Sequence, residues 1–251
     1  MSYLTFRRSI LGFLIVLVSL AGARAIAEEP AEVLVFGGTG QLGTEIVQRL
    51  VARGDQVTVY TRSGSDRSLL DGMPVKYIEG DLMKPAEVTA AFKHQHFDAV
   101  IIAVRVEDGD IHFYEKGLTP LVAAAKATGV GRIIHSSAVG AGANVQNFQN
   151  LGWEKVPGLL DRLKDQGVGE ALVRNSGIPW TIIRNTRVYP AGTPATGKAV
   201  LTEDGTVIDP LTRADLAALT VGCLADAACI GKTYHVRDPS LTWPPPQRRA
   251  P

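Results

Sequence analysis

The feature that most constrains the fold is a short apolar run that breaks into glycines and continues as a helical pattern. The run is Val33–Phe36, and glycines follow at positions 37, 40 and 43. This spacing suits a buried strand, a tight turn and a helix N-terminus, where exposed amides and the helix dipole favour a phosphate. The stretch predicts a dinucleotide site whose cofactor contacts are Gly37, Thr39, Gly40, Gln41, Leu42 and Gly43.

Strand-like and helix-like segments alternate along the rest of the chain. We expect strands over residues 33–36, 56–60, 74–79, 97–104, 132–135, 180–184, 206–209 and 232–236. We expect helices over residues 44–53, 85–93, 114–128, 159–175 (broken by Gly167 and Gly169) and 213–225. This alternation predicts an α/β fold with a single Rossmann-like, doubly wound parallel sheet and helices on both faces. Ligands of such a sheet bind at the carboxyl ends of its strands, where the strand order reverses.

The composition fits one globular domain and excludes some functions. The chain has 251 residues, 45% hydrophobic and 20% charged, and its net charge of +1 does not indicate a nucleic-acid partner. No group of His, Cys or carboxylate residues has metal-site spacing, so we expect no metal. Cys223 and Cys229 are six residues apart and would face different sides of one helix, which favours two packing residues unless the chain bends between them.

The first 27 residues have the pattern of a signal peptide. Arg7 and Arg8 precede an apolar run over residues 10–20, and small residues follow, with cleavage after Ala25 or Ala27 fitting equally well. The run is short against the roughly 20 residues that span a bilayer, so we expect cleavage and no stable membrane anchor. The protein would then be exported, to the periplasm if it comes from a bacterium with two membranes.

Two points about the ends of the chain follow from this interpretation. The paired arginines resemble a twin-arginine signal, whose pathway carries folded proteins, although Phe6 stands where Ser or Thr is usual. An ordinary secretory signal is an equal alternative.

The dinucleotide-binding domain would occupy residues 28–238, and residues 239–251 would form a Pro-rich tail. The sequence does not indicate an oligomeric state.

Residues at the ends of the predicted strands favour NADP over NAD. Arg62 follows the second strand, where NAD-binding proteins have an acidic residue that binds the ribose, so a 2′-phosphate would be attracted there. Asp81, followed by Leu82, comes after the third strand and either holds the adenine amino group or caps the next turn. The remaining residues expected to contact the cofactor are Ala103, Val104, Arg105 and Ser136.

Five segments in order resemble the atypical short-chain dehydrogenase/reductases, in the NAD(P)-binding NmrA-like group. They are Val-Phe-Gly-Gly-Thr-Gly-Gln-Leu-Gly, Thr-Arg62, Gly-Asp81-Leu, Ser136-Ser137-Ala and Ser176-Gly-Ile-Pro-Trp-Thr-Ile-Ile-Arg184. Within the group, the sequence looks most like the biliverdin reductase B, or NADPH flavin reductase, type. The resemblance places one active-site position on Ser137. It places a second on Gln166, where most extended relatives have Lys and flavin reductase has His.

The chain lacks the pair of residues that short-chain dehydrogenases use for carbonyl reduction. None of its six tyrosines has a lysine four residues later. A flavin, quinone or linear tetrapyrrole can accept hydride on a conjugated system and take its proton from water. We therefore predict an NAD(P)H-dependent oxidoreductase, preferring NADPH, that passes hydride to such a small-molecule acceptor. The alternative is a non-catalytic NADP-binding redox sensor of NmrA type.

Four residues around these positions have open or minor roles. Ser137 either orients the reactants or satisfies backbone groups at the strand end. His135 should point to the face opposite Ser137 and serve packing, and Lys164 would reach the site only after a register shift in its helix. Tyr189 either lines the acceptor pocket or packs beside Pro190.

Overall fold

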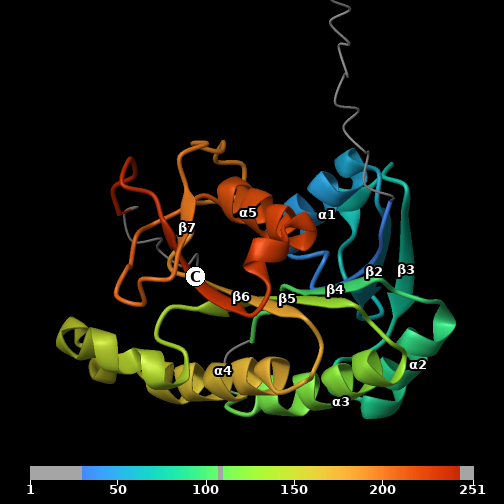
Figure 1. Cartoon of the computed structure of the whole chain (residues 1–251), viewed down its shortest axis with the longest axis horizontal. Helices are drawn as coiled ribbons and strands as arrows, with labels where there is room; N and C mark the ends of the chain where they lie inside the picture. Colours follow the sequence, from blue (N-terminus) through green and yellow to red (C-terminus); the bar gives the residue numbers. More distant parts are fainter. Residues whose placement is uncertain (1–29, 107–109, 244–251) are drawn as a thin grey trace, which may run out of the picture.

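The computed structural model describes residues 30–106 and 110–243 (Figure 1). The predicted signal peptide and residues 244–251 of the predicted tail lie outside this part. The strands are β1 (Glu32–Phe36), β2 (Gln56–Thr61), β3 (Val75–Glu79), β4 (Ala99–Ile102), β5 (Arg132–Ala138), β6 (Trp180–Asn185), β7 (Val200–Thr202) and β8 (Lys232–Arg237). The α-helices are α1 (Gln41–Arg53), α2 (Pro85–His94), α3 (Phe113–Ala127), α4 (Leu159–Arg174) and α5 (Arg213–Ala225).

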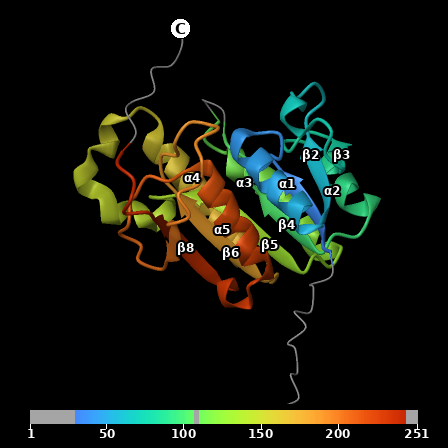
Figure 2. The same cartoon turned by 90° about the horizontal axis from the view of Figure 1, so that it is seen from above.

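The strands form one sheet in the order β3-β2-β1-β4-β5-β6-β8-β7, as the sequence predicts for a doubly wound fold. All neighbours are parallel except β7, which pairs antiparallel with β8. Helices α1 and α5 cover one face of the sheet, and α2, α3 and α4 cover the other (Figures 1 and 2). The strand order reverses between β1 and β4, so the carboxyl ends of these two strands mark the expected ligand crevice.

Alternating side chains of the central strands build a core on each face of the sheet. In β1, Val33 and Val35 face α1 and α5, whereas Leu34 and Phe36 face α2 and α3. Each of these four residues is fully buried. Both faces of the strand are therefore apolar, as is typical of a parallel sheet that is covered on both sides.

Two secondary-structure predictions are wrong. The strand expected over residues 206–209 lies earlier, at Val200–Thr202, because Asp204 accepts hydrogen bonds from the amide and hydroxyl of Thr206 and closes a turn there. Helix α4 is continuous, although Gly167 and Gly169 were expected to break it. A Cβ on Gly167 would lie 2.3 Å from the Cα of Gly142, so this glycine permits a close approach of the helix to a neighbouring loop.

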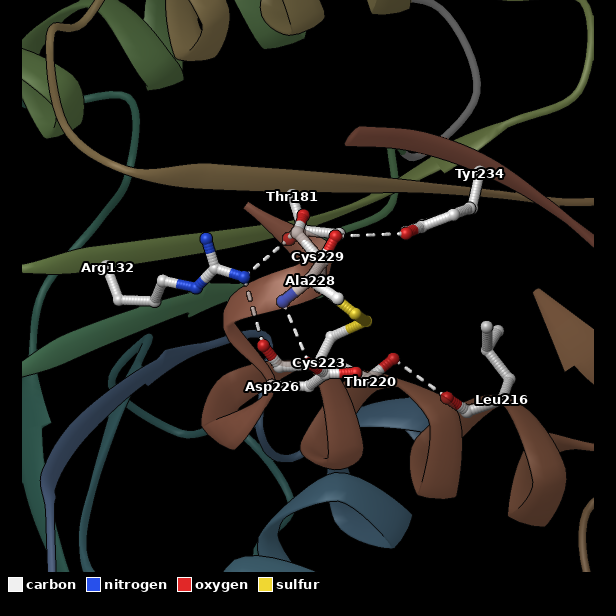
Figure 3. The surroundings of a disulfide bond; sticks show 9 residues. All are labelled: Arg132, Thr181, Leu216, Thr220, Cys223, Asp226, Ala228, Cys229 and Tyr234. Carbon is white, nitrogen blue, oxygen red and sulfur yellow. Dashed lines mark hydrogen bonds between the residues drawn. A yellow bond between two sulfur atoms is a disulfide. The ribbon is translucent and has the colours of Figure 1, made fainter. Parts of the chain in front are cut away.

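The two cysteines form a disulfide, so the prediction that they are separate packing residues is wrong and the alternative of a bend is confirmed. Helix α5 ends at Ala225, and the chain turns at Asp226 into the 3₁₀ turn η4 (Ala227–Cys229), which brings the two Cα atoms to 5.5 Å (Figure 3). The backbone carbonyl groups of both cysteines accept hydrogen bonds from side chains. Arg132 donates to that of Cys223 at 3.0 Å, and Thr181 to that of Cys229 at 2.6 Å.

Arg132 and Thr181 lie at the starts of the neighbouring strands β5 and β6, so these two hydrogen bonds tie the disulfide-linked end of α5 to the amino edge of the sheet. That edge is opposite the carboxyl ends of the strands. No α-helix within the described ranges is long and apolar enough to cross a bilayer.

Candidate functional site

The turn after β1 has the close packing that its glycines predict. Gly37 has a φ of +81°, and a Cβ there would lie 2.6 Å from the carbonyl oxygen of Ala103 at the end of β4. A Cβ on Gly43 would lie 2.0 Å from the carbonyl oxygen of Gly37. Side chains at these two positions would push the turn away from β4 and α1. By contrast, a Cβ on Gly40 would meet only one atom within 4 Å, the Gly37 oxygen at 3.3 Å.

The N-terminus of α1 is suited to an anion. Its N-cap residue is Gly40, which has no side chain to cap the first amides, and the first turn contains no acidic residue. Uncapped amides and the positive end of the helix dipole attract a phosphate group. Because this cradle is open on the Gly40 side, the residues present fit the diphosphate of a dinucleotide. Gln41 and Leu42 belong to the same first turn.

A pocket at the carboxyl ends of β2 and β3 brings together two of the residues predicted from the strand ends. Arg62 lies after β2 and Asp81 after β3, and both line the pocket together with Ser63, Glu79, Gly80, Lys84 and Glu87. Asp81 caps the following turn, since its carboxylate accepts the amide of Met83 at 2.9 Å. Its contact with adenine stays a prediction. The side chain of Leu82 is buried in the core, so only its backbone is left for a cofactor.

Two basic residues that sequence reasoning did not single out neutralise acids of this pocket. Lys84 pairs with Glu87 at 3.0 Å, and Glu87 also accepts the amide of Asp81 at 2.8 Å. The Asp81 amide and Lys84 hold the pKa of Glu87 below its usual value. Arg67 pairs with Glu79 and stacks 4.5 Å over the Tyr77 ring. The pocket therefore repels a phosphate less than its acidic residues alone suggest.

A row of polar residues crosses the other half of the sheet. Ser137, Arg184 and His235 are register partners on β5, β6 and β8. Glu170 of α4 lies against this row and is almost completely buried. Its carboxylate accepts the Ser137 hydroxyl at 2.8 Å and both Nε and Nη2 of Arg184 at 2.8 and 2.7 Å, while Arg174 donates to it at 2.8 Å.

Glu170 is ionised at neutral pH despite its burial. Burial acts to raise the pKa of Glu170, but the hydrogen bonds and charge of Arg184, the Ser137 hydroxyl and Arg174 outweigh it and lower the pKa. An ionised carboxylate can only accept hydrogen bonds, so the Ser137 proton is directed at Glu170. Ser137 is 1% exposed, and its hydroxyl oxygen retains only acceptor capacity. Its contact with the reactants stays a prediction.

Gln166 belongs to a separate contact on the same face of α4, one turn before Glu170. Its amide donates to the Tyr114 hydroxyl at 3.0 Å, and Tyr114 donates to the carbonyl of Val104 at 3.3 Å. Burial raises the pKa of Tyr114, so the phenol is neutral. The structure thus ties Gln166 to the segment after β4 that contains Ala103, Val104 and the exposed Arg105. Ser136 points to the opposite face and accepts the Asn185 amide at 3.0 Å.

The prediction that His135 faces away from Ser137 is wrong, because residues two apart in a strand share a face. Its packing role agrees with the structure, since the ring is fully buried 6.1 Å from the Tyr114 ring. Lys164 is exposed on the continuous α4, where no register shift brings it to the site. The hydroxyl of Tyr189 donates to the carbonyl of Thr242.

Sequence reasoning did not find His235, which is 1% exposed. Its Nδ1 lies 2.7 Å from the carbonyl of Val207, and its ring stacks on Phe148 of the 3₁₀ segment η2 (Gly142–Leu151). Asn144 of the same segment donates to the Gly205 carbonyl at 2.9 Å, which ties η2 to the turn over the polar row. His235 reaches the polar row through the pairing of β8 with β6, two strands that are far apart in sequence. The described residues contain no cluster of His, Cys, Asp or Glu that could hold a metal ion.

Comparison with known proteins agrees with the geometry of the turn. A family model described as NAD(P)H-binding matches residues 37–227, which are most of the chain. The chain belongs to this NAD(P)H-binding family. The match includes the glycine turn, the pocket residues, and Ser137, Glu170 and Arg184, whereas His235 of the polar row lies beyond it. The family contains oxidoreductases, and the atypical short-chain dehydrogenase/reductase resemblance is consistent with it.

The individual relatives are more distant. Sterol demethylase protein B of Methylococcus capsulatus is 34% identical over 132 residues, which are 49% of this chain and 40% of that protein. An NAD(P)H azoreductase of Xenophilus azovorans is 23% identical over 213 residues, 82% of this chain and 68% of that protein. The solved structure of the anaerobillin reductase ChuY of Escherichia coli O157:H7 has a TM-score of 0.73 at 19% identity and covers 85% of this chain and 100% of that one. The chain spans less than half the length of several curated relatives that it matches.

Proposed function

We propose that this protein is an NADPH-dependent reductase that passes hydride to a conjugated acceptor such as a flavin, a quinone or a linear tetrapyrrole. The observation that carries the proposal is that two hydroxyls, those of Tyr114 and Ser137, already donate within the protein. The Tyr114 hydroxyl donates to a backbone carbonyl, and the Ser137 hydroxyl donates to Glu170. Carbonyl reduction needs a proton delivered to the substrate oxygen, whereas a conjugated acceptor takes its proton from water.

The residues of helix α4 support the same conclusion. By its resemblance to the family, α4 carries the active-site position on Gln166, and Glu170 lies one turn later. Neither a glutamine nor an ionised glutamate replaces a tyrosine as a proton donor, and neither lowers the pKa of one as a lysine does. Two of the proteins compared above have names that describe reductases, which supports reduction as the reaction class.

Each group of residues has a definite part in this function. When bound, the nicotinamide supplies the hydride. The glycine turn and the first turn of α1 bind the diphosphate, and Arg62 binds a 2′-phosphate and so selects NADPH. Tyr114 and Gln166 hold the segment after β4 in place, and the network of Glu170 with Ser137 and Arg184 forms a fixed polar wall beside the acceptor.

The test is to purify the mature protein and to follow NADPH oxidation with flavins, quinones, linear tetrapyrroles and small carbonyl compounds. We expect turnover with at least one conjugated acceptor and none with simple carbonyls. Turnover with carbonyls alone would overturn the proposal. Tight NADPH binding without any turnover would instead favour the non-catalytic NADP-binding sensor, which the burial of Ser137 also allows.

We further propose that the protein is exported, since the disulfide between Cys223 and Cys229 suits an oxidising compartment. The test expresses the full chain in a bacterium with two membranes, traps free thiols and counts labelled cysteines in each fraction. We expect a shorter, unlabelled form in the periplasm. A full-length form with both thiols labelled in the cytoplasm would contradict export. A matched variant with Arg7 and Arg8 changed to Lys distinguishes a twin-arginine signal from an ordinary one.

A further inference from the structure

Two helices begin side by side at the carboxyl edge of the sheet. Helix α1 follows β1, and α5 leads through η4 into β8, which is parallel to β6. Both helices therefore run against the strand direction and start at the same edge. They pack against each other on one face of the sheet (Figures 1 and 2). The first residue of α5 is Arg213, so its side chain starts at the same edge of the sheet as the turn that forms the diphosphate cradle.

Arg213 is held in place without an acidic partner. The side chain is half-buried, and its Nη1 donates to the backbone carbonyl of Tyr189, which leaves most of its five N–H donors available. The nearby carboxylate of Asp215 is occupied by the amides of Thr196 and Gly197 and by the hydroxyl of Thr212. In the parts of the chain that the structure describes, no carboxylate lies within 4.0 Å of the Arg213 guanidinium.

A second cation, Arg105, lies at the same edge of the sheet, two residues after Ala103, whose carbonyl oxygen packs against Gly37. Burial and the charge of Arg105, in the segment after β4, both lower the pKa of Arg213, while Glu45 of α1 acts in the opposite direction. Arg105 also lacks an ion pair with any described residue. Two guanidinium groups near each other and near the positive end of a helix are unfavourable by themselves. Their arrangement is favourable when an anion lies between them.

We propose that Arg213, together with Arg105, binds the diphosphate group of the dinucleotide at the N-terminus of α1. This inference rests on the cofactor part of the proposed function and is independent of the acceptor. A guanidinium presents a planar pair of donors that matches two phosphate oxygens. Arg62 lies in the separate pocket at the carboxyl ends of β2 and β3, so the two sites recognise different phosphates of NADPH.

The experiment measures dissociation constants of NADPH, NADH, ADP and adenosine by titration calorimetry with the purified protein. We expect Arg213→Gln to weaken NADPH, NADH and ADP about tenfold each, which is the loss of one charge-assisted hydrogen bond. Adenosine, which has no phosphate, should bind as it does to the unchanged protein. The salt dependence of ADP binding should also decrease. Arg213→Lys, which keeps the charge and loses the planar fork, should recover part of the affinity.

Arg162→Gln is the matched control, because Arg162 is exposed on α4 at the opposite face of the sheet. It should change none of these constants. If Arg213→Gln unfolds the protein, which circular dichroism reports, Arg105→Gln provides the same comparison. Unchanged ADP affinity in both variants would overturn the inference. Absence of any NADPH binding by the unchanged protein would instead overturn the proposed function itself.

Discussion

The two halves of the sheet differ in the groups that they present at its carboxyl edge: one presents mainly backbone, and the other presents charged and polar side chains. The half from β1 to β4 presents backbone to its ligand, and side chains are absent where they would obstruct it, as at Gly37 and Gly43. The half from β5 to β8 contains a buried charged network centred on Glu170. The first half is therefore suited to a ligand of fixed shape, the dinucleotide. The second half is a rigid wall whose polar groups are largely satisfied by one another.

From this difference we expect cofactor binding and the proposed reaction to depend on separate interactions. The cradle requires the glycines of the turn and the N-terminus of α1, and it does not depend on a particular set of neighbouring side chains. The wall depends most on Glu170, because removing it leaves the nearly buried Arg184 without its carboxylate partner. Changes in the Glu170 network should therefore affect stability and turnover, and changes in the glycine turn should affect cofactor affinity.

The largest expected effect comes from Glu170→Ala. It leaves Arg184, whose side chain is 12% exposed, without its carboxylate partner, and the unfolding free energy should fall by about 3–5 kcal/mol. Denaturant unfolding monitored by circular dichroism measures this loss. Where the variant is still folded, its affinity for ADP should change less than threefold. If the binding free energy of ADP fell by as much as the unfolding free energy, the two halves would not be separate.

The next effect is a pH dependence of stability that comes from the buried His135, two residues before Ser137 on β5. Burial lowers the pKa of His135 to about 4, whereas an unfolded histidine titrates near 6.5. Between these values the unfolded chain binds the proton and the folded protein does not, so stability falls as the pH decreases from about 6.5 to about 4. His135→Gln removes this titration. From pH 7 to pH 4 the unfolding free energy of the unchanged protein should fall by about 3 kcal/mol more than that of the variant. Parallel pH profiles would contradict the assignment.

Gly43→Ala tests the first half directly. The added Cβ would lie 2.0 Å from the Gly37 carbonyl oxygen, so the turn must open, and NADPH affinity should fall about 100-fold. Gly222→Ala is the matched control in α5, where a Cβ meets no atom within 4 Å. Fluorescence titration with NADPH compares the two variants. Similar affinities in both would mean that the close packing of this turn does not shape the cradle.

The same contrast explains how much the sequence can predict. The turn after β1 and the strand-end positions of Arg62 and Asp81 can be predicted from local spacing, because each depends on residues a few positions apart, whereas the cofactor contacts of Arg62 and Asp81 stay predictions. Glu170 and His235 are invisible to that reasoning, since their partners lie on strands that are adjacent only in the folded sheet. Gly167 illustrates the same limit, because a glycine that permits close approach to Gly142 has the same local pattern as one that ends a helix.

The smallest effect expected is a change in the preference for NADPH over NADH, without a general loss of cofactor binding. Arg62→Ala should raise the KM for NADPH about tenfold and leave the KM for NADH within a factor of two, because only NADPH carries the 2′-phosphate. Steady-state rates with the best acceptor from the panel measure both constants. Lys76→Ala, an exposed basic residue on the neighbouring β3, is the control and should change neither. Equal increases for both cofactors would place Arg62 with the diphosphate group and remove the distinction between the two phosphate sites.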